Sequence, residues 1–105
     1  MLATNQSQSS LAQITARKLQ IIEVEAWFEV LKDLAEKHNL YLELENRYWK
    51  SAYIYSKQSG DKLGRIWIDG LGIICYDRKN WVSHFEQVPT LESAINELVD
   101  SAIEF

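Results

Sequence analysis

The sequence predicts an α+β fold, in which an antiparallel meander sheet of four to five strands carries an N-terminal and a C-terminal helix on one face. Five short segments rich in β-branched and aromatic residues follow one another with only turn-sized gaps, at residues 40–45, 48–56, 64–69, 71–77 and 81–88. Before and after them, apolar residues recur at three- and four-residue intervals, which is typical of amphipathic helices. The predicted order of elements is therefore α-β-β-β-β-β-α.

Length and composition indicate one soluble domain. A chain of 105 residues, 47% apolar and 25% charged, has room for a single globular unit, which we place at residues 11–105. No apolar stretch approaches the roughly 18 to 20 residues that a membrane span needs, and no basic segment followed by an apolar one marks a secretory signal. The single cysteine, Cys75, has no internal disulfide partner, which fits a reducing compartment. We therefore expect a cytoplasmic protein.

The N-terminal third changes character along its length. Residues 1–10 are small, polar and uncharged, which predicts a disordered tail. Residues 11–22 are compatible with a helix, with a strand, or with a segment that covers the sheet. From about Glu23 a helix is indicated, and Asn39 is a suitable left-handed stop. The apolar stripe of this helix consists of Val24, Trp27, Phe28, Leu31, Leu34 and Ala35.

Alternation along the first three predicted strands assigns their side chains to two faces. The face expected to pack on the helices is aliphatic and carries Leu40, Leu42, Leu44, Ala52, Ile54, Ile66 and Ile68. The opposite face mixes rings with charges and carries Tyr41, Glu43, Glu45, Trp49, Ser51, Tyr53, Tyr55, Arg65 and Trp67. If the loop near Gly60 sets Tyr55 opposite Arg65, Tyr53 falls opposite Trp67 and the aliphatic sets share a side.

A C-terminal helix is predicted after Pro89, with Thr90 as its cap. Its buried stripe is Leu91, Ala94, Ile95, Leu98, Ala102 and Ile103. Carboxylates crowd its far end, where the helix dipole prefers cations. We therefore expect a basic neighbour for this end.

The inventory of chemically reactive residues is small. His38 and His84 have no second ligand at metal-binding spacing, so neither a metal nor another cofactor is expected. Cys75 alternates with Ile73 on what we take to be the core face, where a free cysteine behaves as a small apolar residue. The sequence therefore predicts a protein that is not an enzyme. An enzyme would require His84, Cys75 and a carboxylate to converge in one pocket.

The ring-bearing face is the strongest functional signal. Tyr, Trp and Arg are enriched at binding hot spots, and exposed apolar patches tend to mark interfaces. The expected partner-binding residues are Tyr41, Trp49, Tyr53, Tyr55, Arg65 and Trp67. We interpret the chain as a protein-binding module, such as an adaptor, an assembly chaperone or a complex subunit, whose partner is another protein or a second copy as a homodimer. The alternative is that residues 11–22 cover this face and make it a second core layer.

Single-stranded nucleic acid is the second candidate partner for the same face. Residues 46–80 carry a net charge of +4, and basic side chains interleaved with rings suit stacking and phosphate contact. The whole chain, however, has a net charge of −4 and a pI near 5.1, which disfavours a polyanion. No stretch of residues carries a recognisable family motif.

Overall fold

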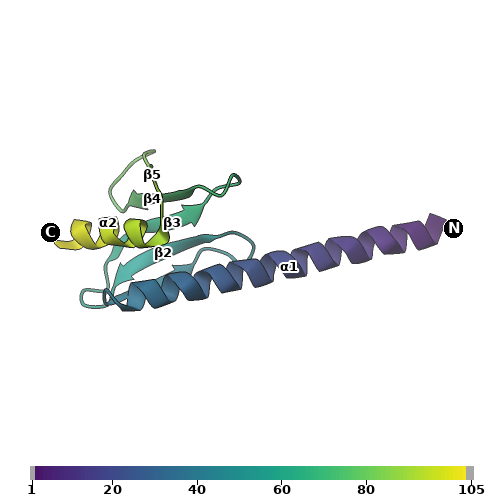
Figure 1. Cartoon of the computed structure of the whole chain (residues 1–105), viewed down its shortest axis with the longest axis horizontal. Coiled ribbons are helices and arrows are strands. Elements are labelled where there is room, and N and C mark those ends of the chain that lie inside the picture. The colour runs from purple at the N-terminus through teal and green to yellow at the C-terminus, as the bar shows by residue number, and fades with distance from the viewer. Residues whose placement is uncertain (1, 104–105) are drawn as a thin grey trace.

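The computed structural model describes the backbone of residues 2–103 and the side chains of residues 11–100. It confirms the α+β fold and the order of elements (Figure 1). The elements are α1 (Leu2–Glu36), β1 (Leu40–Leu44), β2 (Ser51–Ser56), β3 (Lys62–Ile68), β4 (Ile74–Arg78), β5 (Glu86–Val88) and α2 (Leu91–Ile103). The five strands lie in the order β1-β2-β3-β4-β5, and every neighbouring pair is antiparallel, as a meander requires.

Both helices pack on the aliphatic face of the sheet. Leu31 of α1, Ile66 of β3 and Leu98 of α2 are fully buried and belong to one core. The other buried members of this core are Trp27, Ala35, Leu40, Ala52, Ile54, Leu63, Tyr76, Ala94 and Ile95. All the positions assigned to the aliphatic face in β1, β2 and β3 contribute to it, either buried or packed against its edge.

Helix α1 is one continuous helix of 35 residues, so residues 11–22 form neither a strand nor a cover for the sheet. The helix stops where Asn39 adopts φ 58°, as the sequence predicts. Its N-terminal half extends well beyond the sheet and gives the molecule dimensions of 64 × 25 × 21 Å (Figure 1). The bounds of α1 include residues 2–10, whose side chains lie outside the described residues. The disordered tail and the domain at residues 11–105 stay predictions.

Two strands begin later than predicted because side chains divert the backbone into turns. Before β2, Oδ1 of Asn46 accepts hydrogen bonds from the amides of Tyr48 and Trp49, at 2.9 and 3.1 Å. Before β4, Oδ1 of Asp69 accepts hydrogen bonds from the amides of Leu71 and Ile73, at 2.8 and 3.0 Å. Asn and Asp side chains favour turns through such local bonds.

Strand β5 is also shorter than predicted, with three residues instead of the eight of residues 81–88. Ser83 adopts φ 53°, which ends extended structure and makes residues 81–85 a loop. Trp81 still packs against the core, with its ring 5.5 Å from that of Tyr76. Trp81 therefore makes the expected apolar contact although residues 81–85 are not part of a strand.

The expected pairing of β2 with β3 is wrong by two residues. Tyr53 lies opposite Arg65 and Ser51 opposite Trp67, and the register shifts between Ile54 and Tyr55. The loop is tighter than expected, since the Ser56 amide donates to the Asp61 carbonyl at 2.9 Å. A shift of two residues leaves every side chain on its predicted face, because the side-chain period in a strand is two.

Cys75 is buried as predicted but on the other face. Tyr76 lies opposite Ile66 and enters the core, whereas Cys75 lies opposite Trp67 on the side away from the helices. Tyr76 suits the core margin because its hydroxyl donates a hydrogen bond to Glu86 at 2.9 Å. The thiol is 1% exposed and lies 3.7 Å from the Ile73 carbonyl oxygen.

Helix α2 begins as predicted and finds the expected basic neighbour. Oγ1 of Thr90 accepts a hydrogen bond from the Ser93 amide at 3.0 Å, which caps the first turn. Arg78 of β4 forms an ion pair of 3.2 Å with Glu97. Arg78 thereby neutralises Glu97, which lies at the middle of α2, the first of the carboxylates toward its far end.

Candidate partner-binding face

The side of the sheet that faces away from both helices is called the ring face here. Its described residues, placed by the strand register, are Tyr41, Glu43, Glu45, Ser51, Tyr53, Tyr55, Lys62, Arg65, Trp67, Cys75, Asp77 and Gln87. Five of the six predicted binding residues are therefore brought together. The sixth, Trp49, lies in the loop before β2 and is 63% exposed.

Aromatic rings on this face are held by stacking and by cations. Tyr41 and Tyr55 stack across β1 and β2, with ring centroids 4.9 Å apart and planes 7° from parallel. Nζ of Lys62 lies 4.0 Å from the centre of the Tyr53 ring. Such ring pairs and cation–π contacts each contribute about 0.5–1.5 kcal/mol. The rings are therefore ordered before any partner arrives.

Trp67 occupies the other end of this row of rings. The guanidinium carbon of Arg65 lies 4.4 Å from the centre of its ring, and the Phe85 ring lies 5.6 Å away at 59°. Sequence reasoning missed Phe85 because it was assigned to a strand at residues 81–88. The signal in the sequence was a large apolar ring among polar residues. The side chain of Phe85 is 52% exposed, so Phe85 joins the candidate surface.

Arg65 is fixed between carboxylates on neighbouring strands. Its guanidinium lies 3.3 Å from Asp77 of β4 and 3.6 Å from Glu45, which follows β1. Glu45 also accepts hydrogen bonds from the hydroxyls of Tyr53, at 3.3 Å, and Ser51. The centre of the ring face is therefore a network that joins three strands and Glu45, the residue after β1, and in it Arg65 is balanced by two acids.

Burial and these acids keep the tyrosine hydroxyls protonated. Partial burial raises the pKa of Tyr53, and the adjacent Glu45 carboxylate raises it further. Burial likewise raises the pKa of Tyr55, with Glu43 as the next cause. A tyrosine is protonated at neutral pH even at its ordinary pKa of 10.0, and these shifts extend the range in which both hydroxyls can donate hydrogen bonds further into alkaline solution.

The ring face is open on its outer side. Tyr41 is 41% exposed, and Tyr53, Tyr55 and Trp67 are half-buried. Because α1 packs on the opposite side of the sheet, the alternative of a second core layer under residues 11–22 is wrong. These side chains can therefore contact another molecule.

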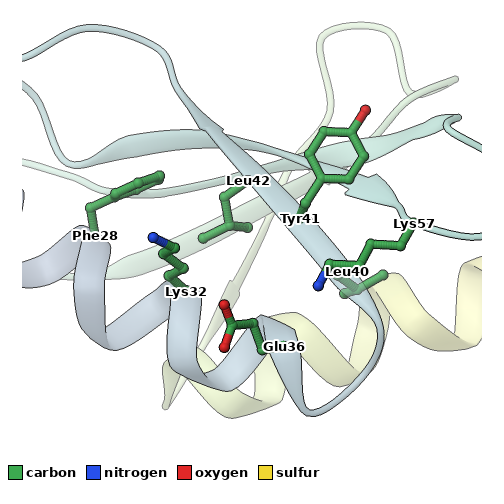
Figure 2. A pocket seen from close by; sticks show the side chains of 7 residues that line it. All are labelled: Phe28, Lys32, Glu36, Leu40, Tyr41, Leu42 and Lys57. Atoms are coloured by element: carbon green, nitrogen blue, oxygen red, sulfur yellow. The ribbon is translucent and has the colours of Figure 1, made fainter.

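A shallow hollow of about 180 Å³ lies where α1 meets the edge strand β1 (Figure 2). Phe28, Lys32 and Glu36 approach from α1, while the Tyr41 ring points away from the helix (Figure 2). The remaining lining residues are Leu40, Leu42 and Lys57. Ligand pockets are usually about 300 to 1,000 Å³, so this hollow is too small to hold a typical substrate.

The residues that an enzyme would need are not brought together. Cys75 lies on the ring face, whereas the His84 ring lies 4.5 Å from that of Trp81 at an angle of 60°. His84 also lies 3.6 Å from Glu86, which accepts the hydrogen bond of Tyr76 on the helix-covered side. Burial raises the pKa of the Cys75 thiol, which disfavours the nucleophilic thiolate. In the described part of the chain, no three His, Cys, Asp or Glu side chains are grouped to hold a metal ion.

Within residues 2–103, neither helix combines the length and the apolar composition needed to span a membrane. Comparison with protein-family models, with curated proteins and with solved structures found no match.

Proposed function

We propose that the chain is a non-catalytic protein-binding module, acting in the cytoplasm as an adaptor, an assembly chaperone or a subunit of a larger complex. The partner protein docks on the ring face. The observation that carries this proposal is a row of ordered rings on the side of the sheet that the helices leave open. The cytoplasmic location is supported by the single cysteine, which is a buried free thiol.

Preorganised rings favour a protein partner. Binding costs free energy when side chains must be immobilised, and here stacking and ion pairs have already restricted Tyr55 and Arg65. Tyr, Trp and Arg supply most of the binding free energy at interfaces where they form a dry cluster. A partner with apolar side chains at its centre and polar groups at its rim would match this face.

Charge disfavours the alternative, single-stranded nucleic acid. Arg65 lies between two carboxylates, and Arg78 lies on the helix-covered side in an ion pair with Glu97. The ring face carries the cations Arg65 and Lys62 against the carboxylates Glu43, Glu45 and Asp77, so it has no net positive charge. Phosphate binding depends on gathered cations, so we expect weak or no oligonucleotide binding.

Replacing single rings tests the proposal. The chain, carrying an affinity tag, is purified from its native host as wild type, Trp67→Ala and Trp49→Ala, and a retained partner is identified by mass spectrometry. Its affinity is then measured with purified components. We expect Trp67→Ala to weaken binding by roughly thirtyfold, corresponding to about 2 kcal/mol for a hot-spot ring. Thermal unfolding of each variant establishes that the fold is intact.

A matched control is Leu71→Ala, because Leu71 is 86% exposed in the turn between β3 and β4 and lies off the row of rings. It should leave binding unchanged. Equal binding by wild type and all three variants would contradict the proposal. Salt-sensitive binding of a short oligonucleotide that is lost in Arg65→Ala would support the nucleic-acid alternative instead.

A further inference from the structure

Helix α1 carries a second apolar stripe, separate from the one that packs on the sheet. Leu11, Leu19, Ile22 and Val30 are 64%, 56%, 58% and 54% exposed. With the small exposed residues Thr15 and Ala26 between them, they recur at intervals of three and four residues. This spacing keeps the six residues along one side of the helix, where a second helix can pack.

The second stripe points away from the sheet. Val24 and Leu31, which pack toward the sheet, are 2% and 0% exposed, although each lies within two residues of a member of the second stripe. At about 100° of rotation per residue, the centres of the two stripes are roughly 150° apart around the axis of α1, so the stripes face largely opposite directions. A helix laid along the second stripe would therefore meet neither the sheet nor the ring face.

The N-terminal half of α1 also lacks the support that its other half receives. Residues 11–19 are exposed and extend past the sheet, whereas contact with the domain begins at Gln20, which donates a hydrogen bond to the Tyr48 carbonyl at 2.6 Å (Figure 1). Isolated helical segments shorter than about 12 to 15 residues are marginal in water. A partner along this segment would supply the packing that stabilises it.

Charge along α1 indicates what that partner is. Residues 11–22 contain Arg17 and Lys18 and no acid, a net charge of +2. Residues 23–36 contain five carboxylates and one lysine, a net charge of −4. Two parallel copies would place like charges together, whereas two antiparallel copies place each basic half against an acidic half. Antiparallel packing also opposes the two helix dipoles.

We propose that a second copy of this chain packs on α1 through the second stripe, in antiparallel orientation. The stripe is centred between Leu19 and Ile22. Leu19 of one copy therefore lies opposite Ile22 of the other copy, and Ile22 opposite Leu19. In this arrangement Lys18 of one copy lies near Glu25 of the second copy. The dimer leaves both ring faces free, so this inference does not depend on the proposed function.

The first test is the molar mass of the full chain as a function of concentration, measured by analytical ultracentrifugation. Wild type should pass from monomer to dimer. Ile22→Glu places a charge in the centre of the stripe and should raise the dimer dissociation constant at least about tenfold, because apolar burial is replaced by buried charge. Gln13→Glu adds the same charge on the opposite side of α1 and should change the constant little. A wild type that stays monomeric, or equal dimerisation by the two variants, would overturn the proposal.

The second test measures orientation. A nitroxide label is attached to Ala12→Cys in a Cys75→Ala background, and the distance between labels in the dimer is measured by electron paramagnetic resonance. In the antiparallel dimer the labels are separated by about 25 Å along the axis, since each residue of a helix adds about 1.5 Å. Labels within about 15 Å of each other would show a parallel dimer and overturn the assigned orientation.

Discussion

At the scale of single residues, Gly64 shows how closely the sheet and α2 approach each other. It lies in β3 opposite Arg78, and a Cβ atom at this position would meet the backbone carbonyl of Asp77 and lie 2.9 Å from Cδ2 of Leu98. Backbone cannot move aside as the end of a flexible side chain can. Glycine is therefore required here by space rather than by backbone conformation.

We predict that Gly64→Ala destabilises the fold by about 1–3 kcal/mol, the usual range for overpacking a core. Gly70→Ala is the matched control, since a Cβ there meets nothing within 4 Å and the residue does not have a positive φ. Chemical unfolding followed by tryptophan fluorescence measures both. Equal stability of the two variants would show that β3 and α2 separate at little cost.

The ionisation of Tyr76 is tied to folding. Its ring is 1% exposed and its hydroxyl donates a hydrogen bond to Glu86. Burial is the largest cause that raises its pKa from 10.0 to about 12, followed by the hydrogen bond to Glu86 and the charge of Glu97. The folded protein therefore holds this proton more tightly than the unfolded chain does.

This difference predicts a loss of stability in alkaline solution. The stabilisation is complete below pH 10 and is lost as the pH rises from 10.0 toward about 12, by roughly 2 to 3 kcal/mol in total. Tyr76→Phe should lower the free energy of unfolding by about 1 kcal/mol at pH 7, through the lost hydrogen bond, and should lack this alkaline loss. Unfolding curves at pH 7, 9 and 11 test the prediction, and parallel pH profiles of the two proteins would contradict it.

At the scale of elements, α1 has one buried face and one exposed apolar face. Leu31 is fully buried against the sheet, whereas its neighbour Val30 is 54% exposed. We predict that Leu31→Ala lowers the free energy of unfolding of the monomer by about 2–5 kcal/mol, the cost of a cavity in a core. Val30→Ala should change it by less than about 0.5 kcal/mol and should instead weaken self-association.

Urea unfolding at a concentration where the chain is monomeric measures the first effect, and sedimentation measures the second. Large destabilisation by Val30→Ala would mean that its side of α1 also packs within the monomer. The two variants, Leu31→Ala and Val30→Ala, thus test folding and self-association separately.

Periodicity predicted the elements better than it predicted their ends. The stripe of Val24, Trp27 and Leu31 was visible because one face of α1 is buried from there onward. The overhang at residues 11–19 was ambiguous, since a segment without tertiary contacts has no buried face to read. Strand ends were displaced by turns in which Asn46 or Asp69 accepts two amide hydrogen bonds, a competition that alternation does not report.

At the scale of the whole molecule, the sequence predicted the α+β meander and the two faces of its first three strands, whereas Cys75 of β4 was assigned to the wrong face. Five of the six expected binding residues share the ring face because strand parity survived a register error of two residues. The contact of Phe85 with Trp67 and the ion pairs of Arg65 could not be predicted, since they depend on how the loop before β5 folds and on which strands become neighbours. The sequence shows how many charges each segment carries, but it does not show which of these charges lie together on one surface of the folded protein.

The overhang of α1 has a consequence for how tightly a target is held. In an antiparallel pair the two sheets lie toward opposite ends of a shared rod, with the two copies of Val30 about 28 Å apart along its axis at 1.5 Å per residue. A target with two suitably spaced docking sites would then be gripped twice, and the second contact would form at a high local concentration. Such avidity would let a modest affinity at each ring face produce a long-lived complex.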